Sequence, residues 1–110
     1  MAKFVITKRR NGEYQFNLVA DNGQVILASE GYVTLTACKN GIESVKKNAP
    51  ILARYDRLIS SNGRYYFNLK ASNGQIIGTS ALYDSLLDRE ECLDNVILET
   101  IPALIEDLTS

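Results

Sequence analysis

The sequence contains two copies of one 22-residue pattern. Residues 11–32 read NGEYQFNLVADNGQVILASEGY, and residues 62–83, 51 positions later, read NGRYYFNLKASNGQIIGTSALY; 13 of the 22 paired positions are identical. Shared composition does not produce such a match, so the chain carries a duplicated structural unit. We expect repeat 1 to span residues 1–51 and repeat 2 to span residues 52–110.

The length of the chain indicates how the repeats combine. A chain of 110 residues is the size of one ordinary domain. A unit of about 50 residues buries too little apolar surface to be stable without help. We therefore expect a single domain over residues 1–110, a pseudo-dimer in which the two repeats complete one core.

Each repeat predicts three antiparallel strands. In repeat 1, residues 4–9, 14–20 and 25–29 have strand patterns, and an Asn-Gly pair separates each segment from the next. Asn-Gly is typical of tight β-hairpins, because Gly adopts the positive φ angles that such turns need. Repeat 2 has the same order of strands and turns.

A helix follows the strands in each repeat. In repeat 1 the apolar residues that recur every three or four positions are Leu35, Cys38, Ile42, Val45 and Ala49. Thr34 or a neighbour is expected to cap this helix, and Asn40-Gly41 to kink or split it. In repeat 2 Cys92 replaces Gly41, so the helix that starts near Ser85 is expected to be straighter and longer.

These elements predict an α+β fold: one six-stranded antiparallel sheet with helices on one face and the other face open. Residues 103–109 are expected to form a short extra strand or a loosely held tail. The expected core residues are Phe4, Ile6, Tyr14, Phe16, Leu18, Tyr65, Phe67 and Leu69 from the strands and Leu35, Ile42, Val45, Leu86, Leu93 and Val96 from the helices.

Several runs resemble the YegP-like family of small bacterial tandem-repeat proteins. The runs are RYDR, SNGRYYFNLKA and QIIGTS in repeat 2 and NGQVIL and GIESVKKNAP in repeat 1. The resemblance implies two β3α2 units in one antiparallel sheet, with the C-terminal helices exchanged between the units. It implies no activity, cofactor or catalytic residue, and single-repeat members are expected to form homodimers.

The composition argues against an enzyme. The chain has no histidine, which excludes Ser-His-Asp and Cys-His catalysis and ordinary histidine metal sites. Cys38 and Cys92 are expected to be free, buried thiols. Glu90, Glu91 and Asp94 are acidic neighbours on one helix, which do not converge on a cation as a loop does. We expect no catalytic, cofactor or metal site.

Hydropathy gives an expected location. No apolar run approaches the roughly 18 residues that span a bilayer, and residues 1–10 lack the apolar core of a signal peptide. A cytoplasmic protein without membrane contact is expected.

Two asparagines stand out because Asn is a poor strand former, yet it occurs in the middle of an equivalent strand in both repeats. Asn17 and Asn68 have two readings: a polar binding site on the open face, or amides that satisfy a neighbouring loop or the exposed sheet surface. The second reading is the more ordinary. The candidate binding face comprises Gln15, Asn17, Tyr66, Asn68, Lys70, Arg64 and Arg10.

From these residues we expect the chain to be a non-enzymatic binding or accessory module. It is expected to bind a protein partner and to be a monomer or a weak homodimer. The alternative is a weak single-stranded nucleic-acid binder in which Tyr66 stacks on a base beside Lys70 and Arg64. The net charge is −1, with +3 in residues 1–50 and −4 in residues 51–110. This distribution lacks the basic footprint of a dedicated nucleic-acid binder.

Overall fold

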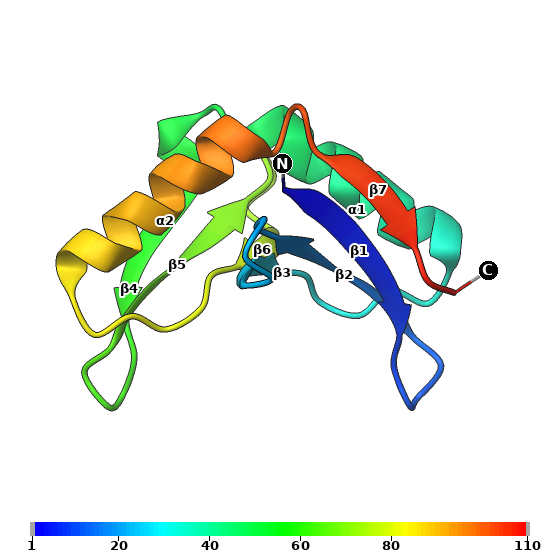
Figure 1. Cartoon of the computed structure of the whole chain (residues 1–110), viewed down its shortest axis with the longest axis horizontal. Helices are drawn as coiled ribbons and strands as arrows, with labels where there is room; N and C mark the ends of the chain where they lie inside the picture. Colours follow the sequence, from blue (N-terminus) through cyan, green and yellow to red (C-terminus); the bar gives the residue numbers. More distant parts are fainter. Residues whose placement is uncertain (1, 110) are drawn as a thin grey trace.

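The structure of the chain, a computed structural model, describes residues 2–109. The order of elements is three strands and a helix, twice, followed by a last strand. The elements are β1 (Lys3–Lys8), β2 (Tyr14–Val19), β3 (Val25–Ala28), α1 (Leu35–Asn48), the 3-10 helix η1 (Leu52–Arg54), β4 (Tyr55–Ile59), β5 (Tyr65–Lys70), β6 (Ile76–Thr79), α2 (Leu86–Glu99) and β7 (Leu104–Asp107). Both α-helices lie on one side of a single sheet (Figure 1), so the fold is α+β.

The four Asn-Gly pairs form the hairpin turns, as predicted. Their glycines are the described residues that have positive φ angles, between 82° and 87°. In the first turn, the Asn11 side-chain oxygen accepts a hydrogen bond from the backbone N–H of Glu13 at 3.0 Å. The same bond recurs at the second and fourth turns. The turn sequence therefore fixes both the backbone angle and the local hydrogen bonding.

The sheet has seven strands in the order β4-β5-β6-β3-β2-β1-β7. β3 and β6 join the two repeats through antiparallel pairing of Ala28 with Thr79. The last strand, β7, runs parallel to β1, with Val5 opposite Glu106. The expected six-stranded antiparallel sheet is therefore wrong in one respect: a seventh strand makes the sheet mixed.

The connections between the elements explain why β7 has no counterpart in the other repeat. After α1 the chain passes through η1 directly into β4, so this connection leaves no residues to cover the outer edge of β4. The segment after α2 is free to pair with β1, and the Leu108 N–H donates to the Ile6 carbonyl at 3.0 Å just beyond the strand. Of the two alternatives for residues 103–109, the structure shows the strand.

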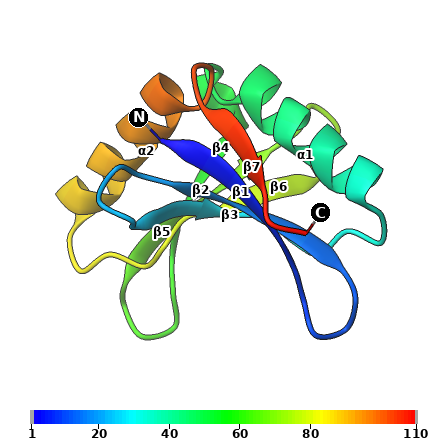
Figure 2. The same cartoon turned by 45° about the vertical axis from the view of Figure 1, so that its right-hand side comes forward.

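Each helix packs on strands of both repeats. α1 contacts β2 of its own repeat and β5 and β6 of the other, and α2 contacts β5 of its own repeat and β3 of the other. Figure 2 shows α2 over the left part of the sheet and α1 over the right part, with their upper ends approaching each other near the middle. The repeats therefore share one helix layer, while a full exchange of the C-terminal helices stays a prediction.

The predicted core is largely confirmed. The fully buried residues include Phe4, Ile6, Phe16, Leu18, Phe67 and Leu69 from the strands and Ile42, Val45, Leu93 and Val96 from the helices. Leu35, Tyr14 and Tyr65 are half-buried. Leu86 is 53% exposed, so the prediction that it belongs to the core is wrong. It is the first residue of α2, directly after the cap Ser85.

The expected split in α1 is wrong, and so is the expected greater length of α2. α1 is continuous through Gly41, and both helices have 14 residues. The predicted cap is confirmed, because the Thr34 hydroxyl accepts a hydrogen bond from the Ala37 N–H at 3.0 Å. Gly41 is a buried packing position, which explains why a residue with poor helix propensity is found there.

Both cysteines are free and buried, as predicted. Burial, with the nearby charge of Asp107, raises the pKa of Cys38 to about 11. Within residues 2–109, no helix is long and apolar enough to cross a membrane.

Candidate functional site

A row of directly paired residues crosses the helix-free face of the sheet. From one edge to the other the row comprises Asp56, Asn68, Thr79, Ala28, Asn17, Val5 and Glu106. Side chains of directly opposite residues point to the same side of a sheet, so all seven belong to one face. Asn17 and Asn68 lie three strand spacings apart, or about 14 Å.

The two asparagines differ in their hydrogen bonding. The Asn68 side-chain oxygen accepts a hydrogen bond from the Thr79 hydroxyl at 2.8 Å. Asn17 lies opposite Ala28, which has no polar side-chain atom. Within the described residues 2–109, the Asn17 side chain has no hydrogen-bond partner. The ordinary structural reading therefore fits Asn68, while Asn17 presents a free amide on the open face.

Three other predicted residues share this face. Gln15 lies two positions before Asn17, while Tyr66 and Lys70 lie two positions on either side of Asn68, so strand alternation places them on the same side. Gln15 accepts a hydrogen bond from the Arg9 guanidinium. The structure thus brings together five of the seven predicted residues.

The other two predicted residues lie in the β-hairpin turns. Arg10 is exposed in the β1–β2 turn. Arg64 ends the β4–β5 turn and forms an ion pair with Asp84 at 3.3 Å. Both hairpins extend away from the helices and splay apart (Figure 1), so the helix-free face is an arch between two projecting turns.

Carboxylates compensate most basic groups around this face. Lys70 pairs with Asp56, Lys3 with Glu106 and Arg9 with Glu13. These ion pairs are partly exposed and contribute little to stability. They nevertheless cancel the positive potential that would attract a phosphate backbone.

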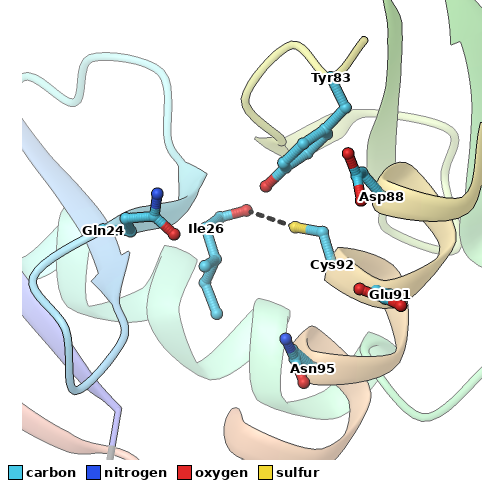
Figure 3. Close-up of a pocket in the computed structure, with 7 residues that line it drawn as sticks. All are labelled: Gln24, Ile26, Tyr83, Asp88, Glu91, Cys92 and Asn95. Atoms are coloured by element: carbon cyan, nitrogen blue, oxygen red, sulfur yellow. Dashed lines mark hydrogen bonds between the residues drawn. The ribbon is translucent and has the colours of Figure 1, made fainter. Parts of the chain in front are cut away.

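A pocket of about 350 Å³ lies elsewhere, where repeat 1 meets α2. Its lining residues are Gln24, Ile26, Tyr83, Asp88, Glu91, Cys92 and Asn95. Figure 3 shows Ile26 between Gln24 and Cys92, with Tyr83 above them. Ile26 and Cys92 are the buried residues of the lining. The Cys92 thiol donates to the Ile26 carbonyl oxygen at 3.4 Å, which ties the helix to the strand of the other repeat.

The pocket results from one difference between the repeats. In repeat 1, Tyr32 stacks on Phe16 with ring centroids 6.1 Å apart. Its hydroxyl lies so close to the Gly41 backbone that a Cβ there would collide with it. In repeat 2 the equivalent helical residue is Cys92, whose Cβ excludes that position for Tyr83. Tyr83 lines the pocket instead.

The titratable groups at the base of the pocket are held neutral. Burial raises the pKa of the Cys92 thiol, although a hydrogen bond with Tyr83 acts in the opposite direction. Burial, together with Cys92, also raises the pKa of Tyr83. A thiol that resists ionisation is a poor nucleophile, so this cysteine is suited to packing and weak hydrogen bonding.

The acidic residues of α2 separate into different roles. Burial disfavours ionised Glu90, but hydrogen bonds from Arg57 and Arg89 outweigh it and lower the pKa of the carboxyl. Glu91 lines the pocket, and Asp94 is exposed. These side chains do not converge, and residues 2–109 contain no cluster of three or more His, Cys, Asp or Glu residues that could hold a metal ion.

Sequence reasoning missed this pocket, although the signal was present. The replacement of Gly41 by Cys92 is visible in the repeat alignment. Helix propensity, however, says only how this replacement affects the continuity of the helix, and nothing about the residues that pack against it. Only the structure shows that the residue packed against this position is a tyrosine from the segment before each helix.

Comparisons with known proteins agree with the duplicated architecture. The model of the "Domain of unknown function (DUF1508)" family matches residues 10–56 and again residues 60–106. The UPF0339 protein encoded in the ptx operon 5′ region of Stutzerimonas stutzeri is 50% identical over 93 residues, 84% of each chain. The UPF0339 protein YegP of Escherichia coli K12 is 40% identical over 106 residues, 96% of each chain.

Solved structures show the same fold. The solution NMR structure of a UPF0339 protein from Shewanella oneidensis has a TM-score of 0.92 at 43% identity, covering 97% of this chain and 91% of the other. That of Escherichia coli YegP, a protein of unknown function, has a TM-score of 0.92 at 38% identity, covering 97% and 92%. The resemblance to YegP-like proteins in the sequence is thereby confirmed.

Proposed function

Because the chain belongs to the DUF1508 family, whose description gives no activity, its function has to be inferred from its own surfaces, and we propose a non-enzymatic binding module. In this proposal the arched, helix-free face of the sheet holds a protein partner. The module is a cytoplasmic monomer, a pseudo-dimer of two repeats that exchange their C-terminal helices.

The free amide of Asn17 is the observation that carries this proposal. An amide side chain can both donate and accept a hydrogen bond, as a peptide group does. The neighbouring side chains in the same row, Ala28 and Val5, are small or apolar and leave room for a chain to approach. An extended polypeptide segment that pairs its backbone with Asn17 matches this chemistry.

The chemistry of the remaining groups supports binding over catalysis. The chain has no histidine. Both cysteines are buried, and their pKa values are raised, so neither is a reactive thiolate at neutral pH.

The alternative, a single-stranded nucleic-acid binder, is less favoured. Tyr66 is half-buried on the open face and could stack on a base. However, Lys70 and Arg64, the cations expected to contact phosphates beside it, are each paired with a carboxylate. Nucleic acid would have to displace both partners, and its binding would be weak at physiological salt.

Site-specific photocrosslinking in the native cell tests this proposal. A photoreactive amino acid replaces Asn17 in one variant and Asp94, an exposed residue of α2, in the control. We expect a defined protein adduct from position 17 that is missing from position 94. The purified partner should then bind the unmodified chain and bind Asn17→Ala more weakly.

Three results would contradict the proposal. An RNA adduct at position 17 would favour the nucleic-acid alternative. Equal adducts at both positions would show unspecific contact. A partner that binds Asn17→Ala as tightly as the unmodified chain would show that the free amide has no role.

A further inference from the structure

The pocket beside Cys92 is a second potential binding site, independent of the helix-free face. It is lined by the β2–β3 turn, strand β3, the segment before α2 and α2 itself. None of its residues belongs to the cross-strand row. It therefore gives the chain a separate surface, formed jointly by the two repeats.

The pocket lies beside the second of two equivalent helices, and its residues differ from those at the equivalent positions of the first. Its helical residues are Asp88, Glu91, Cys92 and Asn95; the equivalent residues of repeat 1 are Ala37, Asn40, Gly41 and Ser44. Repeat 1 therefore lacks both carboxylates at these positions, and there Tyr32 packs against the helix. Divergence of the duplicated helix has produced both the space and its negative charge.

The two pocket carboxylates are not neutralised by the arginines near them. Arg57 and Arg89 both bind Glu90, at 3.0 Å each. Within residues 2–109, neither Asp88 nor Glu91 has an ion-pair partner. Both arginines are thus paired with Glu90, and the negative charge of Asp88 and Glu91 at the pocket stays uncompensated.

The neutral groups of the pocket add hydrogen-bonding capacity. Gln24 and Asn95 contribute side-chain amides, and Tyr83 contributes a hydroxyl (Figure 3). Carboxylates and amide oxygens together accept the several N–H groups of an ammonium or guanidinium group. Ile26 and the neutral Cys92 thiol provide an apolar base against which a short aliphatic chain can pack.

We propose that this pocket binds a small organic cation that carries an ammonium or guanidinium group on a short aliphatic chain. The cation lies between the α2 carboxylates and the Gln24 amide, with its aliphatic part against Ile26 and Cys92. The same group can come from a free amine or from an arginine side chain of a peptide. A pocket of about 350 Å³ has room for either.

Titration of the full chain, followed by amide chemical shifts in NMR, tests the proposal. The probes are agmatine, its neutral analogue butylurea, and a capped Gly-Arg-Gly peptide. We expect agmatine, the peptide or both to give saturable shifts at Gln24, Cys92 and Asn95, and butylurea to give none. Binding of agmatine alone would identify a free-amine site, and binding of the peptide alone would identify an arginine side-chain site.

Matched variants separate the pocket from general acidity. Glu91→Gln combined with Asp88→Asn should weaken binding about tenfold or more, because two charged acceptors are lost. Asp94→Asn removes one charge from the same helix outside the pocket, and should change the affinity less than about twofold at physiological salt. Equal effects of Asp94→Asn and of the double variant would overturn the proposal.

A third variant tests the cavity itself. Cys92→Gly keeps both carboxylates but removes the Cβ that excludes Tyr83 from the helix, so Tyr83 can pack as Tyr32 does and reduce the pocket. We expect this variant to lose most of its affinity for the probe. Unchanged affinity in folded Cys92→Gly, or shifts in the unmodified chain that spread over the whole acidic surface without saturation, would show that no built site exists.

Discussion

The two repeats are alike in their turns and strands and differ where their helices meet the segment before them. Both have the same hairpins, the same buried aromatic residues, Phe16 and Phe67, and helices of equal length. In repeat 1, Gly41 lets the Tyr32 hydroxyl lie close to the helix backbone. In repeat 2, Tyr83 meets the Cys92 side chain and both residues line a pocket. Duplication thus preserves the frame, while single substitutions make the halves chemically different.

A second difference lies at the junction of the repeats. Leu27 and Gly78 occupy equivalent positions, and a Cβ on Gly78 would collide with the Leu27 side chain. Two leucines therefore do not fit where β3 lies beside β6 in this arrangement. The close approach of β3 and β6 requires the repeats to differ here, since a large side chain has to meet a small one.

The largest expected effect comes from making repeat 1 resemble repeat 2. Gly41→Cys should destabilise the chain by about 3 kcal/mol, because its Cβ collides with Tyr32 and crowds Phe16 in a packed core. Urea denaturation measures the change. Tyr32→Leu as a second substitution should recover part of the loss in a double-mutant cycle. A Gly41→Cys variant of unchanged stability would show that Tyr32 relocates freely, and the contrast between the helices would fail.

The hairpin turns should respond alike in both repeats. Gly23→Val and Gly74→Val should each cost about 2 kcal/mol through backbone strain at positive φ. Both glycines have φ of 85°, and a Cβ at either position would meet no atom within 4 Å, so steric contact adds nothing to either. Thermal unfolding of the two variants gives the comparison. Clearly different midpoints would mean that the two turns are not equivalent.

The paired asparagines should respond differently. Asn68→Ala removes the hydrogen bond from Thr79 and should cost about 1 kcal/mol, whereas Asn17→Ala should leave stability nearly unchanged. Denaturant midpoints of the two variants, with Thr79→Val as a partner control for Asn68, measure this difference. Equal losses would indicate that Asn17 has a structural partner, and would remove the main support for binding at the open face.

The smallest effect concerns acid stability. Because the pKa of Glu90 is lowered in the folded chain, its contribution is present above its ordinary pKa of 4.5 and is lost as pH falls through the lowered value. Glu90→Gln should reduce the fall in stability below pH 4.5 by well under about 1 kcal/mol, since the pair is partly exposed. Denaturation at neutral and acidic pH measures the slope. An unchanged slope would mean that Arg57 and Arg89 do not stabilise the ionised carboxyl.

Much of the fold was predictable because its signals are local. Asn-Gly pairs predicted the turns, and Thr34 predicted a helix cap. The alternation of apolar and polar residues predicted that the strand face carrying Phe16 and Phe67 is buried. The parallel pairing of β7 with β1 was not predictable. The two strands lie about 100 residues apart in the sequence, and such a long-range pairing is not encoded in the residues near either strand. The continuity of α1 was misjudged for a related reason: helix propensity penalises Gly41, but packing against Tyr32 requires it.

The candidate site was predicted as a set of residues but not as a chemical arrangement. Strand alternation alone placed Gln15, Asn17, Tyr66, Asn68 and Lys70 on one face. It could not show that Thr79 satisfies Asn68 while Ala28 leaves Asn17 free, because those partners depend on the register of neighbouring strands. The ion pairs that neutralise the basic side chains near this face could not be predicted from the sequence for the same reason.

By itself, the duplicated sequence determined the strands, the turns and the two-repeat plan, because hairpin angles and side-chain alternation depend on neighbours within a few residues. Only the tertiary structure decided what the differences at Gly78 and Cys92 do to the packing, and that β7 covers the edge of β1. The consequence of each substitution depends on which distant atoms pack against it, and only the folded chain brings those atoms together.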